Sequence, residues 1–363
     1  MRANTGRLSK RLLRKRPIIF MVVSASIGII FFSLAGAATP YVSLEAETGL
    51  ISGSAIRVTD SSGSGGQAIK FGPSTIPSGK PDANNTGVPV GTVLTLVEGN
   101  TTISQPGVYD ANDYRGFVTV TASNVTLTRS KFNGGTLPVV ACDPAKSGSG
   151  ATGALVISSN ATNVVIEDSD IIIANPHKLI DGLRGSNFTL RRSEVSRGVD
   201  GIGIYGVGNV VVENSYIHDL YWFAESQYHQ CTPSHNDSIQ LHNGVNVRFS
   251  SNTIIGKTFN NANANAAIQV NQNGGQTTGN LTIDGNWMNY GGCTLNISEN
   301  QLAAINNLKV TNNKFGRNAS VLISGEPCAI IVSTITKAYA GTVINGNVWE
   351  DGSLPVPTIR TGR

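Results

Sequence analysis

The side chains best suited to chemistry gather in one stretch of this 363-residue chain, from His218 to His242. Four of the five histidines lie in it, and the fifth, His177, lies a little upstream. Imidazole is the side chain that exchanges a proton most readily near neutral pH. The concentration therefore predicts at least one histidine in a functional site, and we expect it in the segment Ser234-His235-Asn236-Asp237.

Three aspartates are candidates to share that site. Asp237 follows His235 by two residues, so the two side chains lie on the same side of an extended strand. Asp200 occupies the place that matches Asp237 in an earlier repeat, and Asp181 joins them if its turn is about three residues shorter. Three interpretations stay open: a calcium site formed by all three, a pair of carboxyl groups for glycoside hydrolysis, and aspartates that each cap a turn.

A lyase or epimerase needs a base that removes the proton beside a uronate carboxylate, and a cation that holds the resulting charge. Histidine or lysine can serve as the base, and arginine or calcium as the cation. The predicted catalytic set is therefore His235, Asp237, Asp200, Lys178 and Arg184.

Aromatic and amide side chains nearby could bind sugar rings. Flat aromatic faces stack on sugars, although the same residues could instead anchor a long loop to the scaffold. The predicted substrate-binding residues are Tyr221, Trp222, Tyr228, Gln240, Gln269 and His242.

A nine-residue unit recurs along the chain and must position these residues. Its eight copies begin at Asn124, Asn163, Asn187, Asn209, Asn246, Asn280, Asn307 and Gly341, with spacings of 39, 24, 22, 37, 34, 27 and 34. Alternating apolar residues in coils of this length are typical of a solenoid that stacks strand on strand. The seventh position is always Ser or Asn, which predicts one internal polar ladder: Ser130, Ser169, Ser193, Ser215, Asn252, Asn286, Asn313 and Asn347.

A second strand precedes most copies, as in DSIQLHN (237–243) and AAIQVNQ (266–272). With these repeats the chain resembles the pectate-lyase-like superfamily over roughly residues 90 to 355. The resemblance implies an all-β fold, a right-handed parallel β-helix of about eight to ten coils with loop insertions. The arginine-rich motif of pectate lyases and the paired-aspartate set of polygalacturonases are absent from the sequence, so the resemblance implies the architecture and leaves the reaction open.

The amino terminus predicts export. Seven basic residues precede an apolar run over 17–37, which fits either a cleaved signal peptide or an uncleaved membrane anchor. We expect four parts: this signal or anchor (1–39), a strand segment with a Pro/Gly linker (40–87), the β-helix (88–356) and a tail (357–363). The protein is expected to be secreted or on the cell surface, with membrane contact only through its amino-terminal segment.

The strand segment has a resemblance of its own. Glu45-Ala46-Glu47 and an Asp60 followed by a Ser-Gly-Gly turn (64–66) are similar to the start of a family of calcium-dependent carbohydrate-binding β-sandwich modules. The resemblance covers about thirty residues, so it implies a remnant or a small strand cluster.

Charge restricts the class of partner, and the cysteine content predicts disulfides. Seven of the 27 basic residues precede Glu45, which leaves 20 basic against 23 acidic residues and argues against nucleic acid as the partner. Four cysteines in an exported chain predict disulfides, and Cys293 with Cys328 is the favoured pair because they lie in neighbouring repeats.

Two hypotheses for function follow from the sequence. The first is an exported polysaccharide-binding β-helix that acts on an acidic glycan as a polysaccharide lyase, epimerase or glycoside hydrolase, with calcium as a candidate cofactor. The second is a non-catalytic glycan-binding or adhesin-like solenoid. Both predict a polysaccharide partner and a monomer.

Overall fold

The computed structural model describes residues 55–59, 67–71, 79–146, 150–206, 208–226, 229–260, 264–271, 278–298, 305–334, 341–355 and 358–361. The chain divides into two units near residue 72. In the first, β1 (Ala55–Thr59) and β2 (Gln67–Phe71) pair antiparallel. The predicted signal or anchor (1–39), Glu45 to Glu47, Asp60 and the Ser-Gly-Gly turn lie outside the described residues. No helix in the described stretches is long and apolar enough to cross a membrane.

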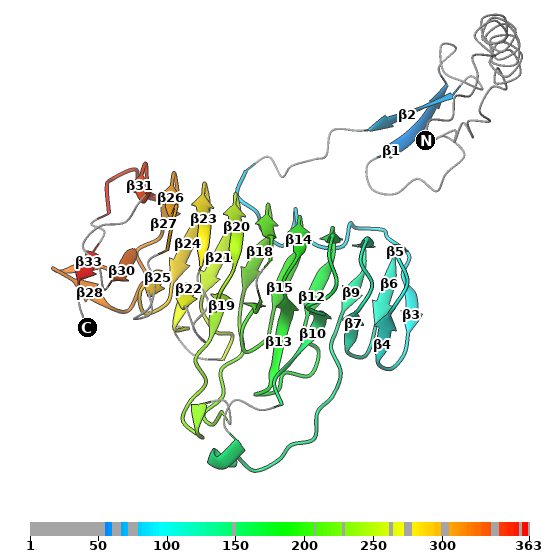
Figure 1. Cartoon of the computed structure of the whole chain (residues 1–363), viewed down its shortest axis with the longest axis horizontal. Coiled ribbons are helices and arrows are strands. Elements are labelled where there is room, and N and C mark those ends of the chain that lie inside the picture. Colours follow the sequence, from blue (N-terminus) through cyan, green and yellow to red (C-terminus); the bar gives the residue numbers. More distant parts are fainter. Residues whose placement is uncertain are drawn as a thin grey trace, which may run out of the picture. The chain divides into compact units, whose positions relative to one another are not determined.

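The second unit is a parallel β-helix, as the repeats predicted. Three parallel sheets of ten, nine and ten strands, counted over the described residues, run side by side along the solenoid (Figure 1). Each coil contributes one strand to each sheet in turn, and we name the sheets I, II and III in that order. Strand pairing within every sheet is parallel from coil to coil.

Sheet I consists of β4 (Thr101–Ile103), β7 (Val118–Val120), β10 (Thr152–Ile157), β13 (Ile180–Gly185), β16 (Ile202–Ile204), β19 (Asp237–Leu241), β22 (Ala266–Asn271), β25 (Leu295–Ser298), β30 (Ile330–Thr334) and β33 (Thr358–Thr361). Sheet II consists of β5 (Gly107–Asp110), β8 (Val125–Thr128), β11 (Val164–Glu167), β14 (Phe188–Arg191), β17 (Val210–Glu213), β20 (Val245–Ser250), β23 (Gly279–Asp284), β26 (Lys309–Thr311) and β31 (Val343–Asn345). Sheet III consists of β3 (Thr95–Val97), β6 (Asn112–Tyr114), β9 (Lys131–Phe132), β12 (Asp170–Ile172), β15 (Glu194–Ser196), β18 (Tyr216–His218), β21 (Thr253–Gly256), β24 (Trp287–Tyr290), β27 (Lys314–Phe315) and β32 (Val348–Trp349). A short 3₁₀ helix, η3 (Pro144–Lys146), and the antiparallel pair β28 (Leu322–Ile323) and β29 (Glu326–Pro327) lie in loops.

The core forms because alternate residues of every strand point inward. Leu127, Ile166, Leu190 and Val212 are in register on sheet II and fully buried. Stacking each coil on the next extends one continuous apolar column, so the outward positions are left free to carry polar and catalytic groups.

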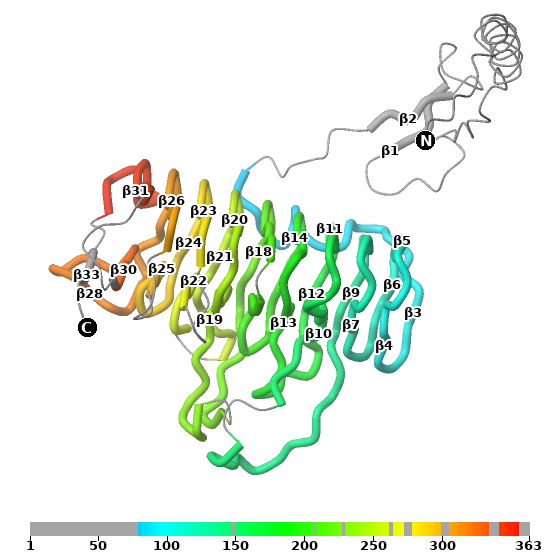
Figure 2. Tube along the Cα trace, in the orientation of Figure 1, coloured from blue at the N-terminus to red at the C-terminus, as the bar shows by residue number. Residues whose placement is uncertain are grey.

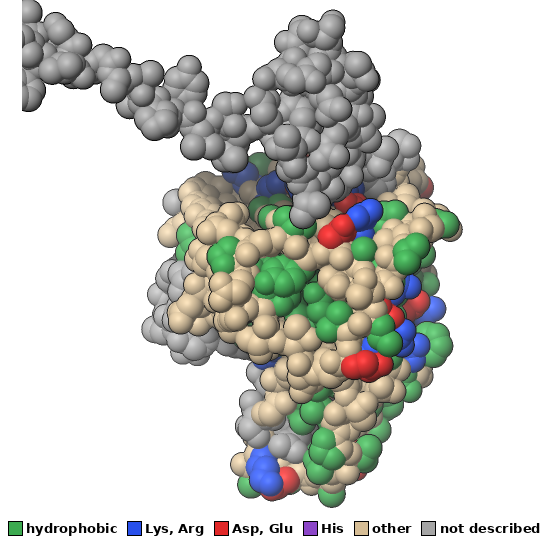
Figure 3. Space-filling view, turned by 90° about the vertical axis from the view of Figure 1, so that its right-hand side faces the viewer, with side chains coloured by type: hydrophobic (Ala, Val, Ile, Leu, Met, Phe, Trp, Pro, Cys, Tyr) green, Lys and Arg blue, Asp and Glu red, His purple; other side chains and the backbone are tan. Residues whose placement is uncertain are grey.

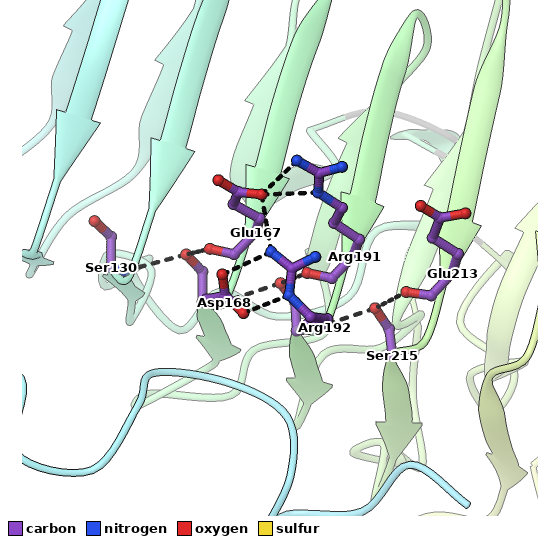
Figure 4. Close-up of polar contacts among 9 residues, drawn as sticks. Ser130, Glu167, Asp168, Arg191, Arg192, Glu213 and Ser215 are labelled. Atoms are coloured by element: carbon purple, nitrogen blue, oxygen red, sulfur yellow. Dashed lines mark hydrogen bonds and ion pairs between the residues drawn. The ribbon is translucent and has the colours of Figure 1, made fainter. Parts of the chain in front are cut away.

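The predicted Ser/Asn ladder is confirmed. It runs through the turns between sheets II and III, where each buried side-chain oxygen accepts the backbone N–H of the preceding ladder residue (Figure 4). The distance is 3.1 Å from Ser130 N to Ser169 Oγ and 2.9 Å from Asn286 N to Asn313 Oδ1. The residue before each ladder member turns the chain sharply; Asp168, for example, has a φ of 49°.

Ion pairs join successive coils beside the ladder (Figure 4). Arg192 donates to both Asp168 and Glu167, at 2.7 and 2.9 Å, and Arg191 donates to Glu167 at 2.7 Å. Because these charges pair across β11 and β14, we assign them a structural role.

Residues 79–92 lie along the solenoid before the first coil begins (Figure 2). Lys80 pairs with Glu350 at 2.8 Å, and Gly87 N donates to Arg192 O at 2.9 Å, so this segment spans several coils. At the first coil, Figure 3 shows hydrophobic side chains on the end face, where Leu96 and Val108 are exposed. At the other end, β33 extends sheet I into the segment predicted as a tail.

Candidate active site

Three carboxyl groups are stacked in register at one edge of sheet I. The register that pairs β13 with β16 and β16 with β19 also aligns Asp181, Asp200 and Asp237. Asp200 N–H donates to Asp181 Oδ1 over 3.1 Å, and Asp237 N–H donates to Asp200 Oδ1 over 2.9 Å. The predicted column is therefore present, and it includes Asp181.

The stacked carboxyl groups perturb one another. Burial, and then the charges of Asp181 and Asp237, raise the pKa of Asp200 well above its ordinary value. Burial also raises the pKa of Asp181, but the neighbouring Arg184 guanidinium opposes this effect. Burial raises the pKa of Asp237 to about 7. Of the three, Asp200 is the carboxyl group best placed to keep its proton at neutral pH.

Arg184 connects the column to an aromatic cluster. Its guanidinium forms an ion pair with Asp181 and lies 4.2 Å from the centroid of the Tyr205 ring. The Tyr205 ring in turn stacks on His242, with centroids 4.4 Å apart. Gly203 leaves space for this arrangement, because a Cβ there would lie 2.6 Å from Tyr205.

Two insertions between sheets III and I form a wall beside this column, through their described residues 133–146, 150–151, 219–226 and 229–236. Figure 1 shows both extending beyond the strands below β10 and β19. A disulfide between Cys142 and Cys231 joins them. Lys178, on a shorter connection between the same two sheets, donates from Nζ to Val140 O over 3.1 Å. The wall is therefore held covalently and by hydrogen bonding.

A small pocket that is open to solvent lies between this wall and sheet I. Six of the residues predicted from the sequence line it: Lys178, Asp181, Arg184, Asp200, His235 and Gln240. They come from three adjacent coils, at β13, β16 and β19, and from one insertion, and only the folded chain brings them together.

Two histidines of the wall face the pocket as a stacked pair. The rings of His229 and His235 have centroids 4.0 Å apart, with an interplanar angle of 25°. Burial, and then His235, lower the pKa of His229 to about 4, so its imidazole is neutral at physiological pH. The flat, neutral ring of His229 can accept a hydrogen bond from a sugar.

Five other predicted residues lie away from the pocket lining. Asp237 is 1% exposed beneath Asp200, where it accepts a hydrogen bond from Asn265 Nδ2 at 3.0 Å. Gln269 is buried, and its Nε2 donates to Asn271 Oδ1 at 2.6 Å.

The remaining three of these are held by the scaffold. His242 is buried against Tyr205. Tyr221 packs on Phe223, with ring centroids 5.1 Å apart, and Trp222 N–H donates to Asn260 Oδ1. Tyr228 lies outside the described residues.

Three polar or aromatic residues of the pocket lining were not predicted: Tyr205, Ser226 and His229. His229 lies six residues before His235, and no strand periodicity indicates that the insertion turns back on itself. Bridging between Ser226 and Thr232 makes that turn. Tyr205 follows β16, a strand that contains Gly203 and comes directly after Gly201. A large aromatic side chain beside such glycines is the sequence signal that could have identified Tyr205 as a pocket residue.

The carboxyl column does not have the geometry of a shared cation site. Asp181 and Asp200 each accept a backbone N–H from the next strand, so the groups form a ladder instead of converging. Within the described residues, no three His, Cys, Asp or Glu side chains are grouped around a point that could hold a metal. The calcium site predicted on Asp181, Asp200 and Asp237 is not supported by this arrangement, and calcium dependence stays a prediction.

The second disulfide joins Cys293 to Cys328, the pair that the sequence favoured. It lies between neighbouring coils, close to Ile331 and Ile323, and stabilises the carboxyl-terminal part of the solenoid. Two disulfides fit a protein that folds in an oxidising compartment.

No family model and no curated protein matches the sequence. Among solved structures, the chain resembles the crystal structure of the Dettilon tailspike protein, with a TM-score of 0.41 and 16% identity. The match covers 74% of this chain and 61% of the tailspike chain, so this chain spans about three fifths of that protein's length. The β-helix assignment rests on the strand pairing of this chain itself.

Proposed function

We propose that this protein is an exported glycoside hydrolase that binds a polysaccharide in the pocket and cleaves it with Asp200 and Asp181. One observation carries the proposal: two neighbouring carboxyl groups line the same pocket in different electrostatic surroundings. Asp200 lies between two other carboxyl groups, whereas Asp181 is paired with Arg184. Pairs of titratable groups whose surroundings separate their pKa values are typical of acid–base catalysts.

The two roles follow from the charges. Asp200 keeps its proton, because ionising it would place a third carboxylate in the column, and it therefore acts as the acid. Asp181 can hold negative charge, because Arg184 pairs with it. Neighbouring strands are roughly 5 Å apart, which is close to the separation of about 5 to 5.5 Å between the carboxyl groups of retaining glycosidases.

The reaction then has two steps. Asp200 donates its proton to the glycosidic oxygen while the Asp181 carboxylate attacks the anomeric carbon, so the leaving sugar departs as an alcohol and a glycosyl ester forms. The Asp200 carboxylate next takes a proton from water, whose oxygen attacks the anomeric carbon and releases Asp181. Both carboxyl groups return to their starting states.

Other pocket residues bind and orient the sugar. Lys178 and Gln240 offer hydrogen-bond donors from opposite sides of the carboxyl pair, and Tyr205 orients Arg184, whose guanidinium lies over its ring. The stacked imidazoles of His229 and His235 exclude water from one side. Asp237 touches no substrate in this scheme and acts through Asp200, as a positioning residue.

The test is release of new reducing ends from a panel of polysaccharides by the purified full chain. We expect Asp200→Asn and Asp181→Asn each to lower kcat by on the order of 100-fold or more, since each removes a proton-transfer or nucleophilic group. Asp170→Asn is the matched control. Asp170 is also a carboxyl group with a raised pKa, but it is only partly buried and lies on β12 of sheet III, where it accepts a hydrogen bond from Val88 N–H.

Product chemistry separates this proposal from its rivals. Hydrolysis with retention gives a product whose anomeric configuration, read by proton NMR, matches that of the substrate. An unsaturated product that absorbs in the ultraviolet would identify a lyase instead. Binding without any product would identify the non-catalytic glycan-binding solenoid, and either outcome would remove the hydrolase assignment.

A further inference from the structure

The outer face of sheet I carries almost no charge. In its strands from β4 to β30, the charged residues are Asp181, Arg184 and Asp237. Asp237 is buried, and Arg184 is paired with Asp181. Past the pocket, β19, β22 and β25 present Gln240, Gln269 and Asn296 in register, one amide on each strand.

The connections from sheet I to sheet II are equally neutral. In their described parts, including 121–124, 158–163, 186–187 and 242–244, they contain Ser, Thr, Asn, Ala, His and Gly and no Asp, Glu, Lys or Arg. Over the residues that the structure describes, the sheet face beyond the pocket and this row of connections are therefore uncharged. Two cations, Lys178 and Arg184, line the pocket.

Two of the amides are available to a ligand. Gln240 and Asn296 are half-buried, and neither side chain hydrogen-bonds to another described residue. Gln269, between them, is committed to Asn271 and Asn265. A side-chain amide both donates and accepts, which matches the hydroxyl groups of a sugar.

An acidic polymer would meet a poor surface here. Each uronate unit carries a carboxylate that needs a cation or several donors to replace its water, and an unpaired charge on a partly buried face is costly. A neutral sugar loses less hydration and finds amides at the required places. The charge distribution therefore favours uncharged units along β19 to β25.

We infer that the polysaccharide which runs along sheet I from the pocket toward β25 consists of uncharged sugars bound by Gln240 and Asn296. This inference rests on the proposed function, since it names the substrate class of the same site. It departs from the acidic glycan expected from the sequence. That expectation followed from the histidines, and the charge of the surface around them was not known from the sequence.

Binding is measured with the full chain carrying Asp200→Asn, which stops turnover. Retardation in gels that contain neutral or polyuronic polysaccharides is compared at about 50 and about 500 mM NaCl, since salt screens charge-dependent contacts. We expect retention by at least one neutral polysaccharide, with an affinity that changes less than about twofold between the two salt concentrations. Retention by polyuronates alone, or no retention by any neutral polysaccharide, overturns the inference.

Point variants locate the surface. Gln240→Ala and Asn296→Ala are each expected to weaken binding of the neutral polysaccharide by roughly three- to tenfold, as for the loss of one hydrogen bond. Thr282→Ala, on the outer face of sheet II, is the matched control and should leave binding unchanged. Equal effects of all three changes would contradict the placement. Hydrolysis of a polyuronate without binding of any neutral polysaccharide would support the proposed hydrolase activity and contradict only the inference that the substrate is uncharged.

Discussion

Replacing Asp237 by Asn isolates the electrostatic effect of a carboxyl group that lies beneath the pocket. Asp237 is 1% exposed, and its backbone N–H, which the substitution keeps, donates to Asp200. An asparagine side chain has nearly the same shape, and its carbonyl oxygen can accept a hydrogen bond from Asn265 or from the Ala266 N–H, both of which donate to Asp237. The substitution therefore removes a charge next to Asp200 with little change in packing.

The expected size of the effect follows from the strand spacing. Two unit charges roughly 5 Å apart, with an effective dielectric constant of about 20, interact by roughly 3 kcal/mol, or about two pKa units. Because the pKa of Asp237 is about 7, the group carries roughly half a charge near neutral pH. We therefore expect the pKa of Asp200 to fall by about one unit in the variant.

Two measurements check this shift. The first is a carbon-13 NMR titration of labelled aspartate, with the Asp200 signal assigned from Asp200→Asn, which needs no substrate. The second is the pH dependence of kcat/KM: its alkaline limb, where the acid loses its proton, should move to lower pH by the same amount. Asp170→Asn should move neither.

A midpoint for Asp200 that stays within about 0.3 units of the unsubstituted protein would refute the reasoning. A loss of activity with an unmoved alkaline limb would show instead that Asp237 has a purely structural role.

Four further outcomes are expected. Asp237→Asn should raise the free energy of unfolding by roughly 1 to 3 kcal/mol near pH 8 and leave it unchanged near pH 4. The pKa of Asp237 is higher in the folded than in the unfolded state, so the carboxyl group contributes fully to stability at low pH and loses this contribution as the pH rises through about 7. Equal gains at both pH values in urea denaturation would contradict this. Asn286→Ala removes a ladder acceptor from a buried backbone N–H and should cost roughly 1 to 3 kcal/mol, whereas Asn306→Ala, in an exposed position, should cost well below that. Removing the disulfide with Cys142→Ser and Cys231→Ser should raise KM by on the order of tenfold, because the pocket wall loses its fixed position, while removing the other disulfide should lower Tm and leave KM unchanged. Dialysis against a chelator should leave activity intact; a loss that calcium restores would re-establish the calcium site predicted from the sequence.

The fold could be predicted because its determinants are local and repeated. Each coil must bury its own alternating apolar residues on the next coil, so the same pattern returns at every turn of the solenoid. The ladder from Ser130 to Asn347 was identifiable for the same reason: a turn that buries backbone N–H groups requires a polar side chain at one fixed position. Asp200 and Asp237 could be aligned because the Asn that follows each strand fixes the register, whereas Asp181 joined them only if its turn was about three residues shorter.

The pocket could not be predicted, because its wall comes from segments that follow no repeat. Cys142 and Cys231 are 89 residues apart, and their pairing brings one insertion against another. The position of His229 opposite His235 depends on how the second insertion turns back on itself. Neither relation leaves a periodic signal in the sequence.

The sequence by itself determined the architecture, the polar ladder and the carboxyl column, since strand periodicity and register fix which residues share a face. Tertiary structure alone decided which members of that column reach the pocket. Asp181 and Asp200 line the pocket, whereas Asp237, Gln269 and His242 are buried within the solenoid. Burial and neighbouring charge assign these residues different chemistry, and both depend on contacts between coils and insertions that lie far apart in the chain.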